Sequence, residues 1–236
     1  MSTFSGYKLD RSMVKYLKSS DTLRNMETLK AIEEILNRVF KWHRFPVNLK
    51  AEAVFLYFKG LSLRAVKEYL LNKGYKVSIE TIREWFHAVG RALQAIYTFA
   101  FWVYVDETKI KARDKTYYLW LAVDEEGLPV FIHLSRRRDS WTAQLVLYNT
   151  KAIGCTTDKG PWYVSAVSKL SMEWIHETFG KRNVVERWFF YIKHRLKRFY
   201  KRFPWNAKYE SVYRSLASFI VIYTIIRTKK LTSSIG

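Results

Sequence analysis

The feature that most constrains this sequence is the stretch W-V-Y-V-D-E-T at residues 102–108. Aromatic and β-branched residues fill it as far as Val105, which is typical of a buried β-strand, and the run stops at Asp106. A carboxylate at the end of an apolar strand is costly to bury unless it is paired or binds a metal ion. We therefore interpret Asp106 as the last strand residue and a candidate site residue, the alternative being a carboxylate that only faces solvent.

Two later acids can complete a site with Asp106. Asp158 lies in T-T-D-K-G-P, where Gly160 and Pro161 end the preceding strand, and Glu186 lies in N-V-V-E-R at the start of a long basic helix. Hard divalent cations prefer carboxylate oxygens, and two ions about 3.5–4 Å apart can hold the attacking and leaving oxygens of a phosphodiester. The order Asp, Asp, Glu therefore predicts a two-metal site for phosphoryl transfer.

Each later acid also has a purely structural interpretation. The sequence D-K-G-P around Asp158 is good turn chemistry without a metal ion. Asn183 followed by Glu186 forms a capping box. Glu107 is adjacent to Asp106 and should point to the opposite face of the strand, which makes it a poor co-ligand.

The charge of the chain favours a polyanionic partner. It has 41 Lys and Arg against 21 Asp and Glu, a formal net charge of +20. Nucleic acid is the first expectation and an anionic membrane the second, although the most apolar run, residues 216–226, is shorter than the roughly 18 residues that a spanning helix needs. We expect that run to be a buried helix. The lack of a leader predicts a cytoplasmic protein, and the single Cys155 excludes an internal disulfide.

Residues 47–95 carry the start and end signals of three short helices. Ser62 and Ser78 can cap the second and third helix, and Gly60 and Gly74 can end the first and second. The pattern is typical of a helix-turn-helix, whose last helix enters the major groove of DNA, or of a three-helix bundle with a solvated charged face. The candidate DNA contacts on the outer face of the last helix are Thr81, Arg83, His87 and Arg91.

The hydrophobic period changes from helical to alternating near residue 100. Strands are expected at 100–106, 116–123, 128–134, 152–158 and 172–176, with helices from 140, between the last two strands, and from 183 and 210. This order predicts an RNase H-like α/β domain, a mixed five-stranded sheet flanked by helices. We expect three parts: an N-terminal helical segment at 1–46, the all-α helix-turn-helix region at 47–95, and the catalytic domain at 96–236.

Basic residues gather after Glu186. Seven Lys or Arg and no acid occur at 187–202, and Lys193 and Lys197 share the helix face of Glu186, where they could hold DNA phosphates. A solvated basic face is the alternative. A second backbone contact is expected from Arg136, Arg137 and Arg138. We expect core positions for Trp188, Phe189 and Phe190.

Taken in order, five motifs resemble the compact DDE transposases of bacterial and archaeal insertion sequences, in particular the insertion-sequence six family: V-D-E-T-K-I-K, Y-Y-L-W-L-A-V-D, T-T-D-K-G-P-W-Y, H-E-T-F-G and N-V-V-E-R-W-F. The resemblance covers about residues 45–228. It implies that Asp106, Asp158 and Glu186 bind two Mg²⁺ or Mn²⁺ ions. It also implies cleavage and joining of double-stranded DNA, the element ends and a target, by water and then 3′-hydroxyl attack. Two ends must meet, which implies a homodimer or a larger assembly.

One departure from the family pattern concerns the second acid. Only 51 residues, positions 107–157, separate Asp106 from Asp158, fewer than the resemblance leads us to expect, and A-I-G-C-T-T-D is poor in β-branched residues. We expect a short strand here, entered by a sharp turn at Gly154. Two alternatives to a transposase stay open: a catalytically impaired DNA-binding regulator and an RNase H-fold nuclease that only hydrolyses.

Overall fold

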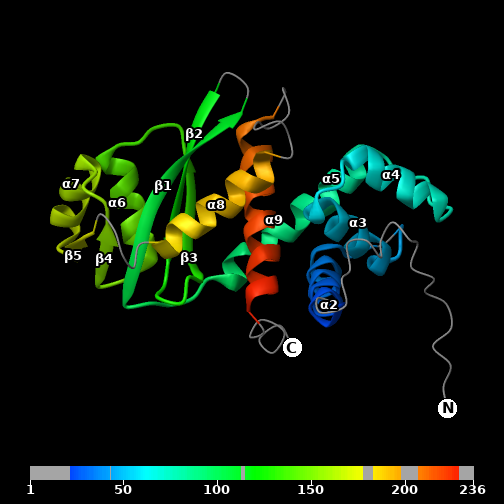
Figure 1. Ribbon diagram of the computed structural model, residues 1–236, viewed down its shortest axis with the longest axis horizontal. Helices are drawn as coiled ribbons and strands as arrows, with labels where there is room; N and C mark the ends of the chain where they lie inside the picture. The colour runs from blue at the N-terminus through cyan, green and yellow to red at the C-terminus, as the bar shows by residue number, and fades with distance from the viewer. Residues whose placement is uncertain (1–21, 43, 113–114, 178–182, 198–206, 229–236) are drawn as a thin grey trace, which may run out of the picture.

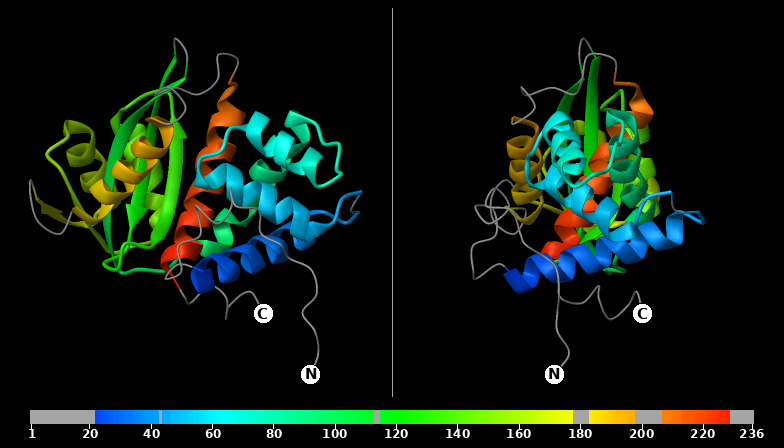
Figure 2. Two further views of the ribbon diagram at one scale, coloured as in Figure 1. Left: turned by 45° about the vertical axis from the view of Figure 1, so that its right-hand side comes forward. Right: turned by 90° about the vertical axis from the view of Figure 1, so that its right-hand side faces the viewer.

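The computed structural model describes residues 22–42, 44–112, 115–177, 183–197 and 207–228. Figures 1 and 2 show a β-sheet and a group of helices on opposite sides of the long helix α9 (Tyr209–Arg227). The rest of the description follows the chain through these two parts.

Among the described residues, four α-helices and a short 3₁₀ helix precede the sheet: α2 (Thr22–Val39), α3 (Val47–Lys59), α4 (Leu63–Asn72), α5 (Ile79–Val89) and η2 (Gly90–Ile96). The Ala65 N–H donates to Ser62 Oγ at 3.1 Å and the Thr81 N–H to Ser78 Oγ at 3.0 Å, so both predicted N-caps are confirmed. Gly60 and Gly74 have φ values of 121° and 85° just past α3 and α4, as the predicted helix ends require.

The sheet has five strands: β1 (Trp102–Ala112), β2 (Lys115–Val123), β3 (Pro129–Ser135), β4 (Gly154–Thr157) and β5 (Glu173–His176). Their spatial order is β3-β2-β1-β4-β5, with antiparallel pairing among the first three and parallel pairing of β4 with β1 and β5. The flanking helices are α6 (Ser140–Thr150), α7 (Pro161–Leu170), α8 (Asn183–Lys197) and α9. This is the predicted RNase H-like arrangement of a mixed five-stranded sheet.

The two faces of the sheet belong to different cores. Along β1, Tyr104 and Ile110 pack in the core that contains α8 and α9, whereas Val103 and Val105 pack in the core of α6 and α7. The alternation follows from the two-residue period of a strand. Even-numbered residues of β1 therefore face α8, and odd-numbered residues face α7.

Helix α9 joins the sheet to the N-terminal helices. It contacts α2, α5 and η2 on one side, and its buried residues belong to a single core that runs from α2 into the sheet. The apolar run at 216–226 is thus a largely buried helix, as expected. The division at residue 95 stays a prediction, and it cuts through this continuous core. None of the described helices has the length and apolar character needed to cross a membrane.

Two sequence expectations around the sheet are wrong. Asp106 is not the last strand residue, because antiparallel pairing with β2 carries β1 on to Ala112. The turn after α6 is not made by Gly154, since Lys151 takes the left-handed conformation there, with φ at 57°. Gly154 is needed for packing instead: a Cβ atom would lie 2.1 Å from the Trp102 ring.

Candidate active site and nucleic-acid interface

Asp106 and Asp158 come from neighbouring parallel strands. Tyr104 on β1 is the register partner of Thr156 on β4. Asp106 follows Tyr104 by two residues within β1, and Asp158 follows Thr156 by two residues, just past the end of β4. By strand periodicity Asp106 therefore shares the α8 face with Tyr104, at the point where β4 ends and β1 continues. Strand β4 forms although only 51 residues separate Asp106 from Asp158, and it brings the two acids to one edge of the sheet.

The carboxylates are tied to their own backbone. The Glu107 N–H donates to Asp106 Oδ1 at 2.9 Å, and the Gly160 N–H donates to Asp158 Oδ1 at 2.9 Å. The second bond closes the turn that leads into α7. Each acid thus has one oxygen oriented by the chain next to it.

The hydroxyl of Tyr163 reports on the electrostatics at this edge. Burial raises its pKa well above the usual value, and the negative charges of Glu107, Asp106 and Asp158 raise it further. Tyr163 is fully buried on α7 and donates a hydrogen bond of 2.7 Å to Glu107 Oε2. Three carboxylates therefore raise the pKa of one buried hydroxyl.

Glu107 faces the side of the sheet opposite to Asp106, as the sequence predicted, but it is more than a solvated neighbour. Its side chain is only 3% exposed, and Arg138 Nη1 lies 3.4 Å from Glu107 Oε1. Burial raises the pKa of Glu107, and the charge of Asp158 adds to the rise, while Tyr163 and Arg138 oppose it. The sequence predicted the direction of the Glu107 side chain but not its contacts with Tyr163 and Arg138.

Glu186 lies on α8, which packs across β1 and β2. Val185 and Trp188 are buried, and Trp188 Nε1 donates to the Gly127 carbonyl at 2.9 Å, while Glu186 is exposed. Within the described residues, no three His, Cys, Asp or Glu side chains are close enough to hold a metal ion together. The strand register brings Asp106 and Asp158 to one edge, but among the described residues the three acids are not close enough together to hold one ion. The Asn183 side chain, the other half of the capping box, lies outside the description.

The three arginines after β3 have different surroundings. Arg138 lies over the rings of Trp162 and Tyr118, with its guanidinium carbon 4.1 and 5.6 Å from their centroids, on the α7 face. Arg136 lines a groove of about 510 Å³ with Lys115 and Lys208 on the α9 side. Arg137 is exposed. Arg136 and Arg138 therefore lie beside different elements, and a DNA backbone contact by the three arginines stays a prediction.

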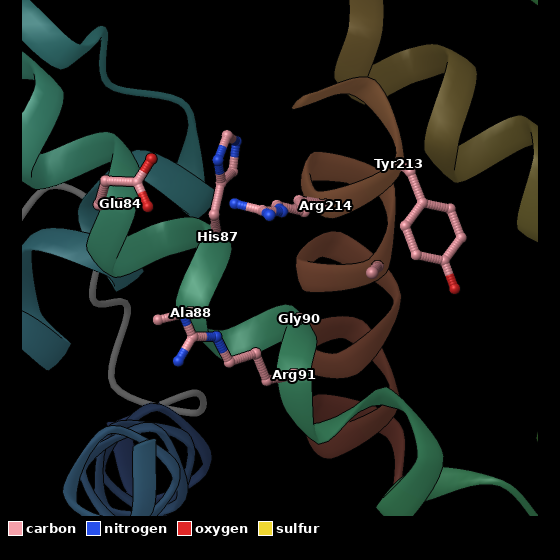
Figure 3. Close-up of a pocket in the computed structure, with 8 residues that line it drawn as sticks. Glu84, His87, Ala88, Gly90, Arg91, Tyr213 and Arg214 are labelled. Atoms are coloured by element: carbon pink, nitrogen blue, oxygen red, sulfur yellow. The ribbon is translucent and has the colours of Figure 1, made fainter. Parts of the chain in front are cut away.

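The expectation that His87 lies on the outer face of α5 is wrong. Its side chain is 5% exposed and Nε2 lies 3.0 Å from Ser215 Oγ on α9. Because the Ser215 hydroxyl also lies within donating distance of the Ser211 carbonyl, at 2.8 Å, we assign the proton to His87 Nε2. Burial lowers the pKa of His87 to about 4. Figure 3 shows Arg214 reaching from α9 toward His87 in a cavity of about 240 Å³ between the two helices.

The other candidates on this surface are at least partly exposed. Thr81 and Arg83 lie on α5, where Arg83 pairs with Glu80, and Arg91 lies on η2 beyond the end of α5. A cavity of about 460 Å³ opens at the N-terminus of α5, between Ser78 and Thr81 and three basic residues that sequence reasoning missed: Arg44, Lys67 and Lys76. They are far apart in the sequence, so no local pattern marks them as a group.

Helix α8 differs from expectation at one aromatic residue. Trp188 and Phe189 are buried as predicted, but Phe190 is 64% exposed, because helical rotation turns it away from the buried face. Lys193 is exposed, whereas the Lys197 side chain lies outside the described part of the chain. The solvent-facing side of α8 thus carries an acid, an aromatic ring and a cation.

Comparison with known proteins gives one family match and several relatives. Residues 100–229 match the family model DDE_Tnp_IS240, described as a DDE domain. An uncharacterized protein of Methanocaldococcus jannaschii is 31% identical over 210 residues, covering 85% of this chain and 98% of that one. An uncharacterized protein of Aquifex aeolicus is 57% identical over 94 residues, 40% of this chain and 78% of the other.

A Staphylococcus aureus transposase for insertion sequence element IS257 is 29% identical over 143 residues, which are 56% of this chain and 63% of the transposase. Among solved structures, the catalytic core domain of BIV integrase aligns with 50% of this chain and 80% of its own, at 18% identity and a TM-score of 0.36. A simian T-cell lymphotropic virus intasome chain aligns with 70% of this chain and 66% of its own, at 16% identity and a TM-score of 0.41.

Proposed function

Since the chain belongs to the family of DDE insertion-sequence transposases, we propose that it cleaves and joins DNA at element ends with Asp106, Asp158 and Glu186 as its metal-binding acids. The observation that carries the proposal is the parallel register of β1 and β4, which brings Asp106 and Asp158 to one sheet edge. Helix α8, which bears Glu186, crosses the same face of the sheet.

The donor chemistry fits Mg²⁺ or Mn²⁺. Both acids at the edge offer only oxygen ligands, and each has one oxygen already oriented by a backbone N–H. Asp106 and Asp158 would hold the ions, and Glu186 would join them when α8 or the edge shifts on binding. When bound, divalent ions polarise the phosphodiester and lower the pKa of an attacking water.

The chain's own residues would position the DNA. Lys193 lies on the side of α8 that carries Glu186, where its ammonium would bind a phosphate next to the acids. Thr81 and Arg83 on α5, with Arg44, Lys67 and Lys76 around the cavity at its N-terminus, would bind a second DNA segment. Two such segments, one read by the helical region and one cut by the sheet domain, agree with a homodimer that joins two ends.

A catalytically impaired DNA-binding regulator is the second candidate function. It is favoured because, among the described residues, Asp106, Asp158 and Glu186 do not form a cluster that could hold a metal ion. It would bind the same DNA but release no cleaved or transferred strand. A nuclease would cleave without joining, so one assay separates all three.

The test incubates the protein and Mg²⁺ with oligonucleotides carrying the ends of its insertion sequence, and follows strand cleavage and strand transfer on a gel. We expect Asp106→Asn, Asp158→Asn and Glu186→Gln each to lose both products while DNA affinity, measured by fluorescence anisotropy, stays within about twofold because the ligands do not contribute to base reading. Glu173→Gln, an exposed acid that starts β5, is the matched control and should keep full activity. Full activity in any one of the three variants would remove that residue from the site.

A further inference from the structure

The exposed ring of Phe190 is not explained by the packing of α8. The residues around it on the buried side, Trp188, Phe189 and Ile192, fill the core, whereas Phe190 leaves nearly two thirds of its surface in solvent. A large apolar ring in water gains nothing for the fold. Its position therefore suggests a ligand that covers it.

The ring is held in place from two sides. His194 stacks on Phe190, with ring centroids 6.1 Å apart and planes at 25°, and Tyr191 meets it edge-on at 5.6 Å and 75°. Tyr191 in turn packs on Tyr223 of α9 at 4.7 Å. Phe190 is thus oriented before any ligand arrives, which lowers the entropy cost of binding.

The surroundings of Phe190 indicate what the ligand is. Glu186 precedes it by one helical turn, so their Cβ atoms lie about 5–6 Å apart on one side of α8. Lys193 follows three residues later on the same side and is exposed. A flat ring next to a cation fits a nucleotide, whose base stacks on the aromatic face while its phosphate meets the ammonium.

We propose that Phe190, with His194 beside it, binds an unpaired nucleobase of the DNA end next to the phosphate that is cut. This inference rests on the proposed function, because it takes Glu186 as a ligand in the active site. Stacking on the ring offsets the cost of opening a terminal base pair and fixes the strand with its phosphate toward the acids. Every base has an aromatic face, so the contact tolerates different end sequences.

The first test is photocrosslinking, which needs neither metal nor activity. Duplexes carrying the element ends are synthesised with 5-iodouracil at one terminal position at a time, irradiated with the full-length protein, and the crosslinked peptide is mapped by mass spectrometry. We expect a crosslink to Phe190 from one or two positions next to the cleavage point. It should persist in Phe190→Trp and be lost in Phe190→Ala. Phe101→Ala is the matched control: this phenylalanine is 67% exposed but precedes the first residue of β1.

The second test is the cleavage rate with Mg²⁺ on paired and on pre-unpaired ends. We expect Phe190→Ala to slow cleavage of paired ends about ten- to hundredfold, Phe190→Trp to stay close to wild type, and a mismatch at the terminal pair to restore part of the loss. A general folding defect would not be repaired by a mismatch in the DNA.

The outcomes separate the two proposals. Wild-type protein that cleaves ends but gives no crosslink to Phe190 would overturn the base-binding role and leave the proposed function intact. In a second outcome, Phe190→Ala abolishes self-association in sedimentation while the crosslinks from the DNA ends stay unchanged. That result would make the Phe190 ring a contact between copies of the chain, and it would also overturn the base-binding role. Failure of the wild-type protein to bind any end would overturn both.

Discussion

The burial of His87 predicts how the stability of the protein depends on pH. The pKa of this imidazole is 6.5 in the unfolded chain and about 4 in the folded one, because burial between α5 and α9 penalises the charged form. Glu84 and Glu80 on α5 oppose the shift, while Arg214 on α9 and Arg83 add to it. Well above pH 6.5, as at pH 8, the ring is neutral in both states and contributes no pH dependence.

Below pH 6.5 the unfolded chain takes up the proton first, so the folded state loses stability until the pH reaches the folded pKa. Linkage between these two pKa values gives a loss of about 2 kcal/mol at pH 5 and about 3 kcal/mol at pH 4, relative to pH 8. His87 is 5% exposed, so solvent screening reduces this little. His87 alone should therefore lower the free energy of unfolding by about 2 kcal/mol between pH 8 and pH 5.

The assay is urea unfolding at pH 8, 6 and 5, followed by circular dichroism. His87→Gln should remove about 2 kcal/mol of the difference between pH 8 and pH 5. Ser215→Ala is the matched control: it takes away the oxygen that accepts from His87 Nε2, so it should cost about 1–3 kcal/mol at pH 8 and leave the pH dependence in place. Parallel curves for wild type and His87→Gln would show that His87 is not buried as a neutral ring and would refute the packing of α5 on α9.

Two further predictions concern the sheet. Tyr163→Phe leaves the buried Glu107 carboxylate without its 2.7 Å donor, so we expect the free energy of unfolding to fall by about 1.5–3 kcal/mol. The same substitution made in a Glu107→Gln background should cost less. Equal losses in the two backgrounds would disprove the coupling between Tyr163 and Glu107. Gly154→Ala brings a Cβ atom onto the Trp102 ring, so thermal unfolding should show a loss of about 1–3 kcal/mol, and an unchanged melting temperature would contradict the close approach.

The element order and the two faces of β1 could be predicted because they follow from local patterns. Ser62 and Ser78 are N-cap residues that mark the starts of α4 and α5. The alternation through Val103, Tyr104 and Val105 shows which residues face α8. The same alternation correctly placed Glu107 opposite Asp106.

The missed features depend on partners that are distant in the chain. Helix α5 is buried on a second side by α9, more than a hundred residues later, so the amphipathic pattern gave no sign that His87 faces Ser215. Arg138 and Tyr163 reach Glu107 from separate elements. Phe190 is different: helical periodicity alone separates it from Phe189, and the error came from reading three consecutive aromatic residues as one core group.

The position of α9 limits how this protein can be re-engineered. One face of the helix closes the core of the sheet and the other supports α5 and η2, although it is encoded at the far end of the chain. A chimaera that exchanges only residues 47–95 for the corresponding segment of a relative would therefore set a foreign α5 against the native α9. An exchange of this proposed DNA-binding region should keep the fold only when the α9 residues that meet α5, among them Ser215 and Arg214, are transplanted with it.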